Sequence, residues 1–335
     1  MENELTLYPW QRAAWQQIQR AREQQRLPHG MLLCGPQGVG KRRFAETLAN
    51  TMLCAATPPD GLPCGHCKGC LLVQAGNHPD RVVIAPEEEG REILVRRIRD
   101  YVAKAGLVGQ LGGHKVVLIE PAERMNNAAA NSLLKTLEEP VSRTLILLLT
   151  AHPAALPATI RSRCQQLTLA APSRAVGSAW LAEQGIGKER ELLLGLAENA
   201  PLQALELHRQ KVLEERQQRL EGFILLLEGQ GDPLKLAEQW EKGDLHRLFD
   251  WMSGWVIDLL RVASGSSASV ALTNPDQQPQ WQRLVTGIDS RALFLLLDKI
   301  YQARPGLRGS LNSRLLLEEL LLTVVQCRRS SSGDM

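Results

Sequence analysis

The sequence predicts an α/β domain built on a parallel sheet, followed by a small helical domain and a helical bundle. Up to about residue 170, short apolar runs alternate with stretches whose apolar residues repeat at helical spacing. Beyond Ala170-Ala171-Pro172 only helical patterns remain. Strands that alternate with helices form parallel sheets covered by helices on both faces, so the first part of the chain should be a three-layer domain.

The strands of this sheet are predicted from five apolar runs, at residues 30–34, 81–85, 115–119, 144–150 and 165–169. Two of the intervening stretches predict amphipathic helices, at 92–105 and 127–139, and Pro140 should end the second. The expected apolar faces consist of Leu94, Ile98, Tyr101, Val102 and Ala105 on the first helix, and Ala130, Leu133, Leu134 and Leu137 on the second.

The rest of the chain shows leucine-rich helical faces with charged backs, as in a helical bundle. Short helices are predicted at 178–184, 188–197 and 202–210, and longer ones at 212–227, 233–240, 245–263, 290–303 and 312–328. The segment 264–280, rich in Ser, Asn, Gln and Pro, predicts a long loop. We therefore expect an α/β domain over 1–170, a small helical lid over 171–211, a helical C-terminal oligomerisation domain over 212–330 and a tail over 331–335.

The composition suits a chain that folds around a core and stays in the cytoplasm. Apolar residues make up 44% of the 335 residues and charged residues 22%, which excludes a disordered chain. The net charge of +3 permits local contact with nucleic acid but does not indicate a protein built around it. The N-terminus has no apolar signal-peptide core, and the longest uncharged run, 144–160, contains two prolines, so no membrane segment is expected.

A glycine-rich segment, Gly35-Pro36-Gln37-Gly38-Val39-Gly40-Lys41-Arg42, joins the first predicted strand to a helix. It fits the phosphate-loop pattern G-x-x-x-x-G-K, in which backbone N–H groups surround a phosphate and the lysine adds positive charge. Any tight strand-to-helix turn uses glycines, which explains Gly35 and Gly40 but not Lys41. A working loop continues with Ser or Thr, whose hydroxyl ligates Mg²⁺, whereas Arg42 offers a metal no acceptor. The pattern predicts a P-loop fold without nucleotide turnover and leaves open whether Lys41 still holds ATP.

Cysteines are clustered just after this helix. Cys54, Cys64, Cys67 and Cys70 have the spacing C-x9-C-x2-C-x2-C. Four thiolates at such intervals can close a tetrahedron around Zn²⁺, and no position would remain open for catalysis. An iron–sulfur cluster is the alternative, but a ferredoxin run continues with a further cysteine and proline, whereas Leu71 follows here. We predict a structural zinc site, with His66 and His78 as bystanders.

Three segments resemble the bacterial clamp-loader family within the AAA+ ATPases. They are Gly35 to Lys41, Asn131-Ser132-Leu133-Leu134-Lys135-Thr136-Leu137-Glu138-Glu139-Pro140 and Ile160-Arg161-Ser162-Arg163-Cys164. The resemblance is tight over about residues 10–170 and architectural beyond them. It implies an AAA+-type P-loop domain with a zinc module, and assembly with gamma/tau and delta subunits. Such an assembly opens the beta sliding clamp and places it on primed DNA.

The chain departs from the motor subunits of that family, gamma/tau, at several positions. After the strand 115–119 the family's Asp-Glu is replaced by Glu120-Pro121, and Pro121 cannot polarise a water. Leu202 stands in the place of a phosphate-sensing arginine, and Thr150 is either a polar sensor or only the end of a strand. Together with Arg42, these changes predict a stationary subunit that does not hydrolyse ATP. It would catalyse nothing alone, although it would belong to a DNA-directed DNA polymerase holoenzyme.

The triplet Ser162-Arg163-Cys164 is retained where the hydrolytic residues are not. In the family, its arginine reaches the γ-phosphate of the ATP held by the neighbouring subunit, so the resemblance implies that Arg163 is a trans-acting arginine finger. A single arginine after a strand would otherwise be interpreted as a surface charge, and Arg161 as an interface or structural residue. Two alternatives remain: a gamma-type ATPase with divergent motifs, and an AAA+ adaptor unrelated to replication.

Overall fold

The computed structural model describes residues 7–58, 60–88, 91–105, 109–111, 113–139, 143–265, 272–308 and 312–328. The chain divides into two compact units, the first ending at Leu207 and the second beginning at His208. Within the described ranges, no helix is both long and apolar enough to cross a membrane.

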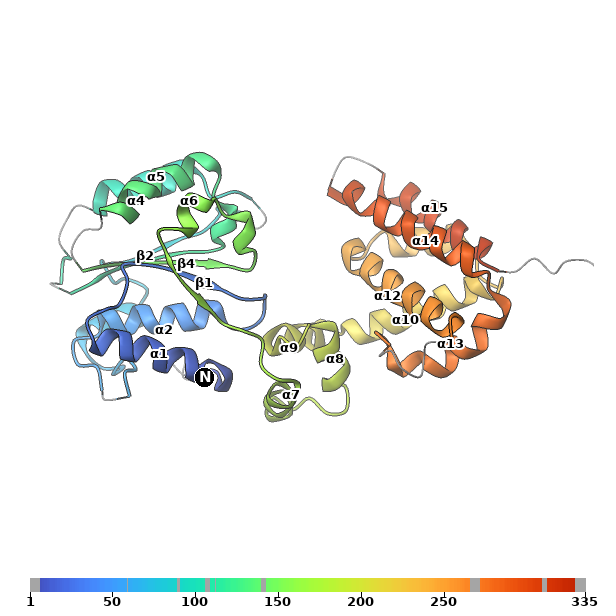
Figure 1. Cartoon of the computed structure of the whole chain (residues 1–335), viewed down its shortest axis with the longest axis horizontal. Coiled ribbons are helices and arrows are strands. Elements are labelled where there is room, and N and C mark those ends of the chain that lie inside the picture. The colour runs from blue at the N-terminus through green and yellow to red at the C-terminus, as the bar shows by residue number, and fades with distance from the viewer. Residues whose placement is uncertain are drawn as a thin grey trace, which may run out of the picture. The chain divides into compact units, whose positions relative to one another are not determined.

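A five-stranded sheet forms the centre of the first unit (Figure 1). Its strands are β1 (Gly30–Cys34), β2 (Arg81–Ile84), β3 (Lys115–Ile119), β4 (Thr144–Thr150) and β5 (Gln165–Thr168), in the order β2-β3-β4-β1-β5. All neighbours are parallel, with Gly30 opposite Ile146 and Met31 opposite Gln165. The carboxyl ends of all five strands therefore lie at one edge, where ligand sites of such sheets are built.

Helices cover both faces of this sheet (Figure 1). One face carries α1 (Arg12–Glu23) and α2 (Lys41–Leu53), and the other carries α4 (Val95–Ala105), α5 (Asn127–Glu138) and α6 (Ala158–Arg161). Successive residues of a strand point to opposite faces, so each strand contributes to two cores. The α1–α2 core contains Trp15, Met31, Leu33, Phe44 and Leu147, whereas the α4–α6 core contains Leu32, Ile98, Leu133, Ile146 and Ile160.

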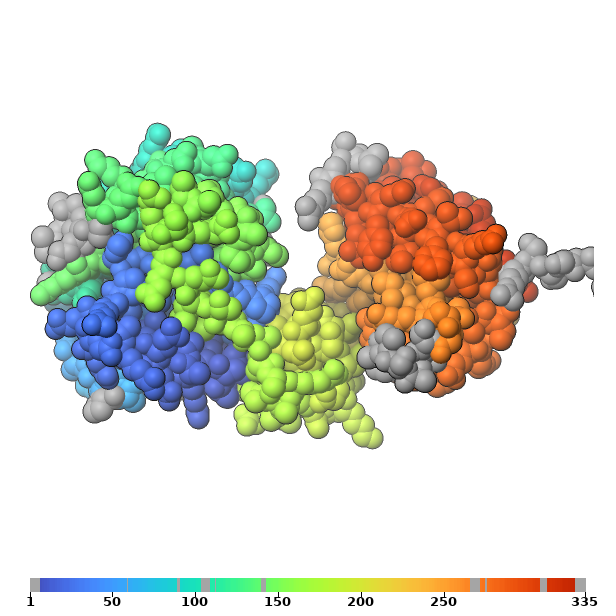
Figure 2. Space-filling view, in the orientation of Figure 1, coloured from blue at the N-terminus to red at the C-terminus, as the bar shows by residue number. Residues whose placement is uncertain are grey.

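Three helices follow the sheet and form the lid: α7 (Arg174–Glu183), α8 (Arg190–Leu196) and α9 (Pro201–Arg209). In Figure 2 they form a yellow-green lobe next to the blue N-terminal segment. Gly177 allows α7 and α8 to approach closely, since a Cβ at this position would lie 3.1 Å from Leu194. A further short helix, α3 (Lys68–Gln74), follows the cysteine-rich loop.

The second unit is helical. Its helices are α10 (Val212–Leu227), α11 (Pro233–Trp240), α12 (Leu245–Ala263), α13 (Gln278–Leu284), α14 (Ser290–Ala303) and α15 (Ser313–Gln326). Asp232, Asp244, Asp289 and Asn312 begin α11, α12, α14 and α15, and each side chain accepts a hydrogen bond from a backbone N–H of the first turn. Large buried side chains, among them Trp255, Trp281, Phe223 and Phe249, fill the core.

A buried polar network holds the segment before α13 in place. The fully buried carboxylate of Asp258 accepts hydrogen bonds from Thr273 N at 2.9 Å, Asn274 N at 2.8 Å and Asn274 Nδ2 at 2.7 Å. Arg216, also buried, donates to Asn274 Oδ1 at 2.6 Å. The sequence predicts a loop over 264–280, but Gln278 begins α13, so this prediction is wrong at its end. Residues 266–271 of the predicted loop lie outside the described part of the chain.

The predicted fold class is confirmed, and its strands agree with the structure to within one residue. Helix ends were less well predicted: the helix expected from residue 92 begins at Val95, and Leu94 lies 40% exposed while Ile93 is buried. The first lid helix begins at Arg174, earlier than expected. Helices α1, α3 and α6 were not predicted. Pro140, expected to end α5, and the side chain of Ala105 lie outside what the structure describes.

Candidate functional site

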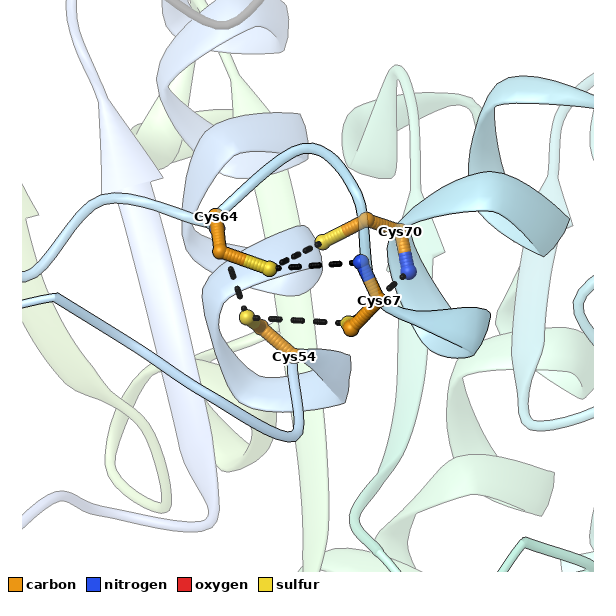
Figure 3. A group of neighbouring side chains, drawn as sticks. All are labelled: Cys54, Cys64, Cys67 and Cys70. Carbon is orange, nitrogen blue, oxygen red and sulfur yellow. Dashed lines mark hydrogen bonds between the residues drawn. The ribbon is translucent and has the colours of Figure 1, made fainter.

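Four cysteines form a compact cluster between α2 and α3. Figure 3 shows their side chains converging from the end of α2, the loop and the start of α3. The four Sγ atoms lie within 4.8 Å of one another, with Cys64 to Cys70 and Cys54 to Cys67 both at 3.9 Å. Sulfurs about 2.3 Å from a central Zn²⁺ form a tetrahedron with edges of about 3.8 Å. The cluster therefore has the size required to hold one metal ion.

Backbone amides donate to three of the four sulfurs. Cys64 N donates to Cys54 Sγ, Cys67 N to Cys64 Sγ and Cys70 N to Cys67 Sγ, each at 3.4 Å. The backbone N–H of His66 lowers the pKa of Cys64, and although burial opposes ionisation of Cys67, the Cys70 N–H helps to bring its pKa to about 6. Burial raises the pKa of Cys70. A bound cation would supply the charge that keeps all four deprotonated together.

The two histidines near the cluster have other contacts. His66 Nδ1 lies 2.8 Å from Cys64 O, and His78 Nδ1 accepts from Asp80 N at 3.1 Å. Gly69 is required by close packing, because a Cβ at this position would lie 2.3 Å from Leu53 O at the end of α2. The donor set is therefore sulfur alone, held by a tight approach of α3 to α2.

The phosphate-loop segment leaves β1 and enters α2 with its lysine turned inward. Gly38 and Gly40 have φ of +81° and +83°, a backbone conformation that favours glycine. Lys41 Nζ donates to Gly35 O at 2.8 Å and to Pro36 O at 2.9 Å. Burial lowers the pKa of Lys41. The predicted ligands Gly35, Gly40 and Lys41 therefore share one loop, in which the ammonium bonds to the loop's own carbonyl oxygens.

Arg42 lies between two acidic side chains. Its Nε lies 3.2 Å from Glu46 Oε1 and 3.5 Å from Glu120 Oε2, so the guanidinium joins α2 to the residue that follows β3. Burial raises the pKa of Glu120, and the charge of Arg42 opposes that rise. In nucleotide-hydrolysing P-loop proteins, the residues at these two places hold Mg²⁺ together. Here the side chains at those places contact each other directly.

The N-terminal segment covers the phosphate loop from one side. Trp10 Nε1 donates to Val39 O at 3.0 Å, and Gln11 Nε2 donates to Val39 O at 3.0 Å and to Gly40 O at 2.9 Å. A Cβ at Gly40 would lie 2.7 Å from the ring of Tyr8. These contacts occupy loop carbonyl groups and restrict the position of the loop.

The lid reaches the same loop. Leu202 N, at the start of α9, donates to Gly38 O at 3.0 Å, and a Cβ at Gly38 would lie 2.5 Å from Gln203 Cβ. Glycine at 38 thus allows α9 to rest directly on the loop. Leu202, which the resemblance places where a phosphate-sensing arginine would stand, is at this contact.

An aromatic cluster links the N-terminal segment to the lid. Tyr8 and Trp10 stack with ring centroids 4.9 Å apart, and the ring of Trp180 of α7 lies nearly perpendicular to both, with its centroid 5.7 and 5.5 Å from theirs. The guanidinium of Arg43 lies 4.6 Å from the Tyr8 ring centroid. Such edge-on and cation–π contacts stabilise the packing beyond the burial of area alone. The cluster holds the lid against the sheet domain beside the phosphate loop.

The Ser162-Arg163-Cys164 triplet divides its side chains between core and surface. Cys164 is buried beneath β1, where a Cβ at Gly30 would meet its Sγ at 3.5 Å. Arg163 Nη1 donates to Ser162 Oγ at 3.3 Å, and Arg163 Nε donates to Glu138 Oε1 at 2.7 Å. The Arg163 side chain remains 35% exposed. Cysteine anchors the turn, and the guanidinium lies at the surface in a defined position.

Sequence comparison assigns the chain to a family. The models for "DNA polymerase III, delta subunit" and for its C-terminal part match residues 10–173 and 210–326. The chain is 40% identical over 321 residues to DNA polymerase III subunit delta' of Pseudomonas aeruginosa, covering 94% of this chain and 96% of that one. The chain belongs to the DNA polymerase III delta-prime family. The delta-prime subunit of Escherichia coli is 30% identical over 321 residues, which is 95% of each chain.

This delta-prime family member is also related to tau/gamma. DNA polymerase III subunit tau/gamma of Haemophilus influenzae is 36% identical over 146 residues, covering 44% of this chain and 21% of that protein. The relationship agrees with the P-loop fold and with the loop's strand-to-helix setting.

The structure brings the four predicted cysteine ligands together, whereas the phosphate-loop residues and Arg163 lie in separate groups of contacts. Thr150 is buried at the end of β4, and its Oγ1 accepts from His152 N at 3.0 Å, so its hydroxyl caps a turn. Arg161 is exposed. Sequence reasoning missed the aromatic cluster of Tyr8, Trp10 and Trp180 and the partner of Arg163, Glu138. The aromatic cluster left no signal in the sequence, because residues as distant in the chain as Trp10 and Trp180 share no periodicity. Glu138 stands within a motif of the family, but nothing in the sequence paired it with Arg163.

Proposed function

We propose that this delta-prime family member is the non-hydrolysing subunit of a DNA polymerase III clamp loader. It would assemble with gamma/tau and delta subunits, supply Arg163 to the ATP site of its gamma/tau neighbour, and help to place the beta sliding clamp on primed DNA. One observation carries the proposal: Arg42, which stands where the phosphate-loop motif requires a metal-ligating hydroxyl, forms an ion pair with Glu120, while Arg163 is partly exposed.

The loss of hydrolysis is supported by the contents of the chain's own phosphate site. Lys41 bonds to loop carbonyl oxygens, Arg42 contacts Glu120, and Pro121 carries no group that can polarise water. Phosphoryl transfer depends on a metal and a positioned water. Arg42 removes a metal ligand, and Pro121 removes the residue that would activate the water. These contacts disfavour the alternative of an active gamma-type ATPase.

The role of Arg163 rests on the chemistry of phosphoryl transfer. A guanidinium against the transferring group offsets negative charge that develops in the transition state, and in well-studied cases an arginine supplied in trans raises the rate by about 10³ to 10⁵. Two features of Arg163 support this role: the next residue, Cys164, is buried, and the Arg163 side chain is partly exposed.

We propose zinc as the metal of the cysteine cluster, with Cys54, Cys64, Cys67 and Cys70 as ligands. Four thiolates suit Zn²⁺, and the sulfur separations agree with a tetrahedral site. With all four positions supplied by protein, the metal would have a structural role, holding the loop between α2 and α3.

Assembly through the second unit is supported by exposed apolar side chains on two helices that pack together. Those of α14 are Phe294, Leu295 and Tyr301, and those of α15 are Leu315 and Leu322, with exposures between 45% and 63%. Exposed apolar side chains of this size favour contact with another chain. The helical domains of the partner subunits are the proposed occupants.

The proposal is tested in a loader reconstituted from gamma/tau, delta and this chain. Arg163→Ala should lower the DNA- and clamp-stimulated ATPase only in part, because other sites keep their own arginines. Arg163→Lys should rescue poorly, since an ammonium keeps the charge but not the planar fork. Arg99→Ala, at an exposed arginine of α4 to which no role is assigned, is the control and should retain the full rate. An Arg163→Ala loader that assembles and hydrolyses ATP at the unmodified rate would disprove the trans-acting role.

A further inference from the structure

The guanidinium of Arg163 is held by its own chain at all three nitrogens. Nε donates to Glu138 Oε1 at 2.7 Å, and Nη2 forms an ion pair with the same oxygen. Nη1 donates to Thr159 O at 3.1 Å and to Ser162 Oγ at 3.3 Å. A guanidinium has five N–H donors in a rigid fork. These contacts leave one donor, on Nη2, without a partner among the described residues.

The fold fixes the position of Glu138, whose carboxylate contacts Arg163. Glu138 is the last residue of α5, and the preceding residue, Leu137, has its carbonyl oxygen 2.8 Å from His29 Nε2. A Cβ at Gly30 would lie 3.0 Å from Leu137 Cδ2 and 3.5 Å from Arg163 O, so glycine lets the end of α5 and the turn of Arg163 pack against the same strand. Glu138 and Arg163 are thereby placed side by side by the core beneath them.

We infer that Glu138 is a positioning residue for Arg163, an inference that rests on the proposed function. An unrestrained arginine side chain loses rotamer freedom when it binds a phosphate, and an oriented one has lost much of it already. Glu138 contacts both Nε and Nη2, so it would orient the fork together with its one remaining Nη2 donor. The pair is half-exposed, so its contribution to folding stability is small. The Glu138–Arg163 ion pair would instead act by orienting the guanidinium.

The test compares four variants of this chain in the reconstituted loader: Glu138→Gln, Arg163→Ala, the double variant, and Glu139→Gln as matched control. Glu139 is adjacent and exposed, and it has no ion pair among the described contacts. Glu138→Gln keeps size and one acceptor but removes the charge. It should lower the Arg163-dependent part of kcat about two- to fivefold, as expected for losing an exposed ion pair, with KM for ATP unchanged. Glu139→Gln should change neither value.

The double variant separates positioning from other roles. If Glu138 acts through Arg163, Glu138→Gln should add nothing once Arg163 is Ala, whereas a role in assembly or folding would persist in that background. A Glu138→Gln loader with unchanged or raised kcat, beside an Arg163→Ala loader that is slowed, overturns the positioning role and leaves the arginine finger standing. An Arg163→Ala loader that is not slowed overturns the proposed function itself.

Discussion

Arg42 and Glu120 contact each other directly, with Arg42 Nε 3.5 Å from Glu120 Oε2, at the place where hydrolysing P-loop proteins keep their metal. A guanidinium cannot ligate Mg²⁺, and Pro121, which follows Glu120 in the chain, has no side-chain group that can polarise water. We predict no ATP hydrolysis by the isolated chain above background, measured as phosphate release with Mg²⁺. Arg42→Thr alone should not restore hydrolysis, because the water-activating residue is still missing.

Lys41→Ala provides the control for that measurement. A contaminating ATPase would be unaffected by this change, whereas activity of the chain itself requires the loop lysine. Hydrolysis that follows the chain through purification and disappears in Lys41→Ala would show that the Arg42–Glu120 pair does not prevent turnover.

The cysteine cluster predicts one zinc per chain. Elemental analysis of protein purified without chelator should give one equivalent, and Cys67→Ser should lose it, because a hydroxyl is a poor ligand in a thiolate site. Limited proteolysis should then cut the loop between α2 and α3 while the second unit stays intact. Cys327→Ala, at a buried thiol of the second unit, should keep its zinc. Iron in place of zinc, or no metal, would contradict the assignment.

Trp180 is predicted to hold the lid to the sheet domain. It is 9% exposed and meets both Tyr8 and Trp10, so Trp180→Ala removes a large buried ring from the aromatic cluster. We expect a loss of about 3 kcal/mol in the unfolding free energy of the first unit, measured by chemical denaturation. Val176→Ala on the same helix, at a residue 39% exposed, should change it by less than about 0.5 kcal/mol. Equal effects of the two changes would show that the cluster does not stabilise the lid.

Gly30 is predicted to be required for the packing beneath Arg163. A side chain at this position meets Leu137 at 3.0 Å and Cys164 at 3.5 Å, so Gly30→Val should destabilise the first unit by about 1 to 3 kcal/mol through overpacking. Gly113→Val is the matched control, since nothing lies within 4 Å of a Cβ there. Denaturation midpoints of the two variants provide the measurement. A Gly30→Val chain as stable as its control would mean that the α5 end and the Arg163 turn adapt independently.

The sequence by itself determined the fold class and the strands, and it singled out the four cysteines that the structure brings together. Apolar runs that alternate with helical periodicity predict a covered parallel sheet, because burial on both faces requires continuous apolar strands. Closely spaced residues such as Cys64, Cys67 and Cys70 could be grouped because a short loop has few ways to separate them. The helix start at Val95 was predicted three residues too early. The start of the short helix α13 was predicted as loop, since a turn-rich composition near Pro279 fits a loop as well as a first helical turn.

Only the tertiary structure decided which distant residues meet. The stacking of Tyr8 and Trp10 against Trp180, the contact of Leu202 with the phosphate loop and the pairing of Glu138 with Arg163 each join separate segments. No local pattern encodes such contacts, because they depend on how helices pack on the two faces of the sheet. The contacts of Lys41 were likewise not predictable, because its partners, Gly35 O and Pro36 O, depend on the path of the loop and not on the residue types of the motif.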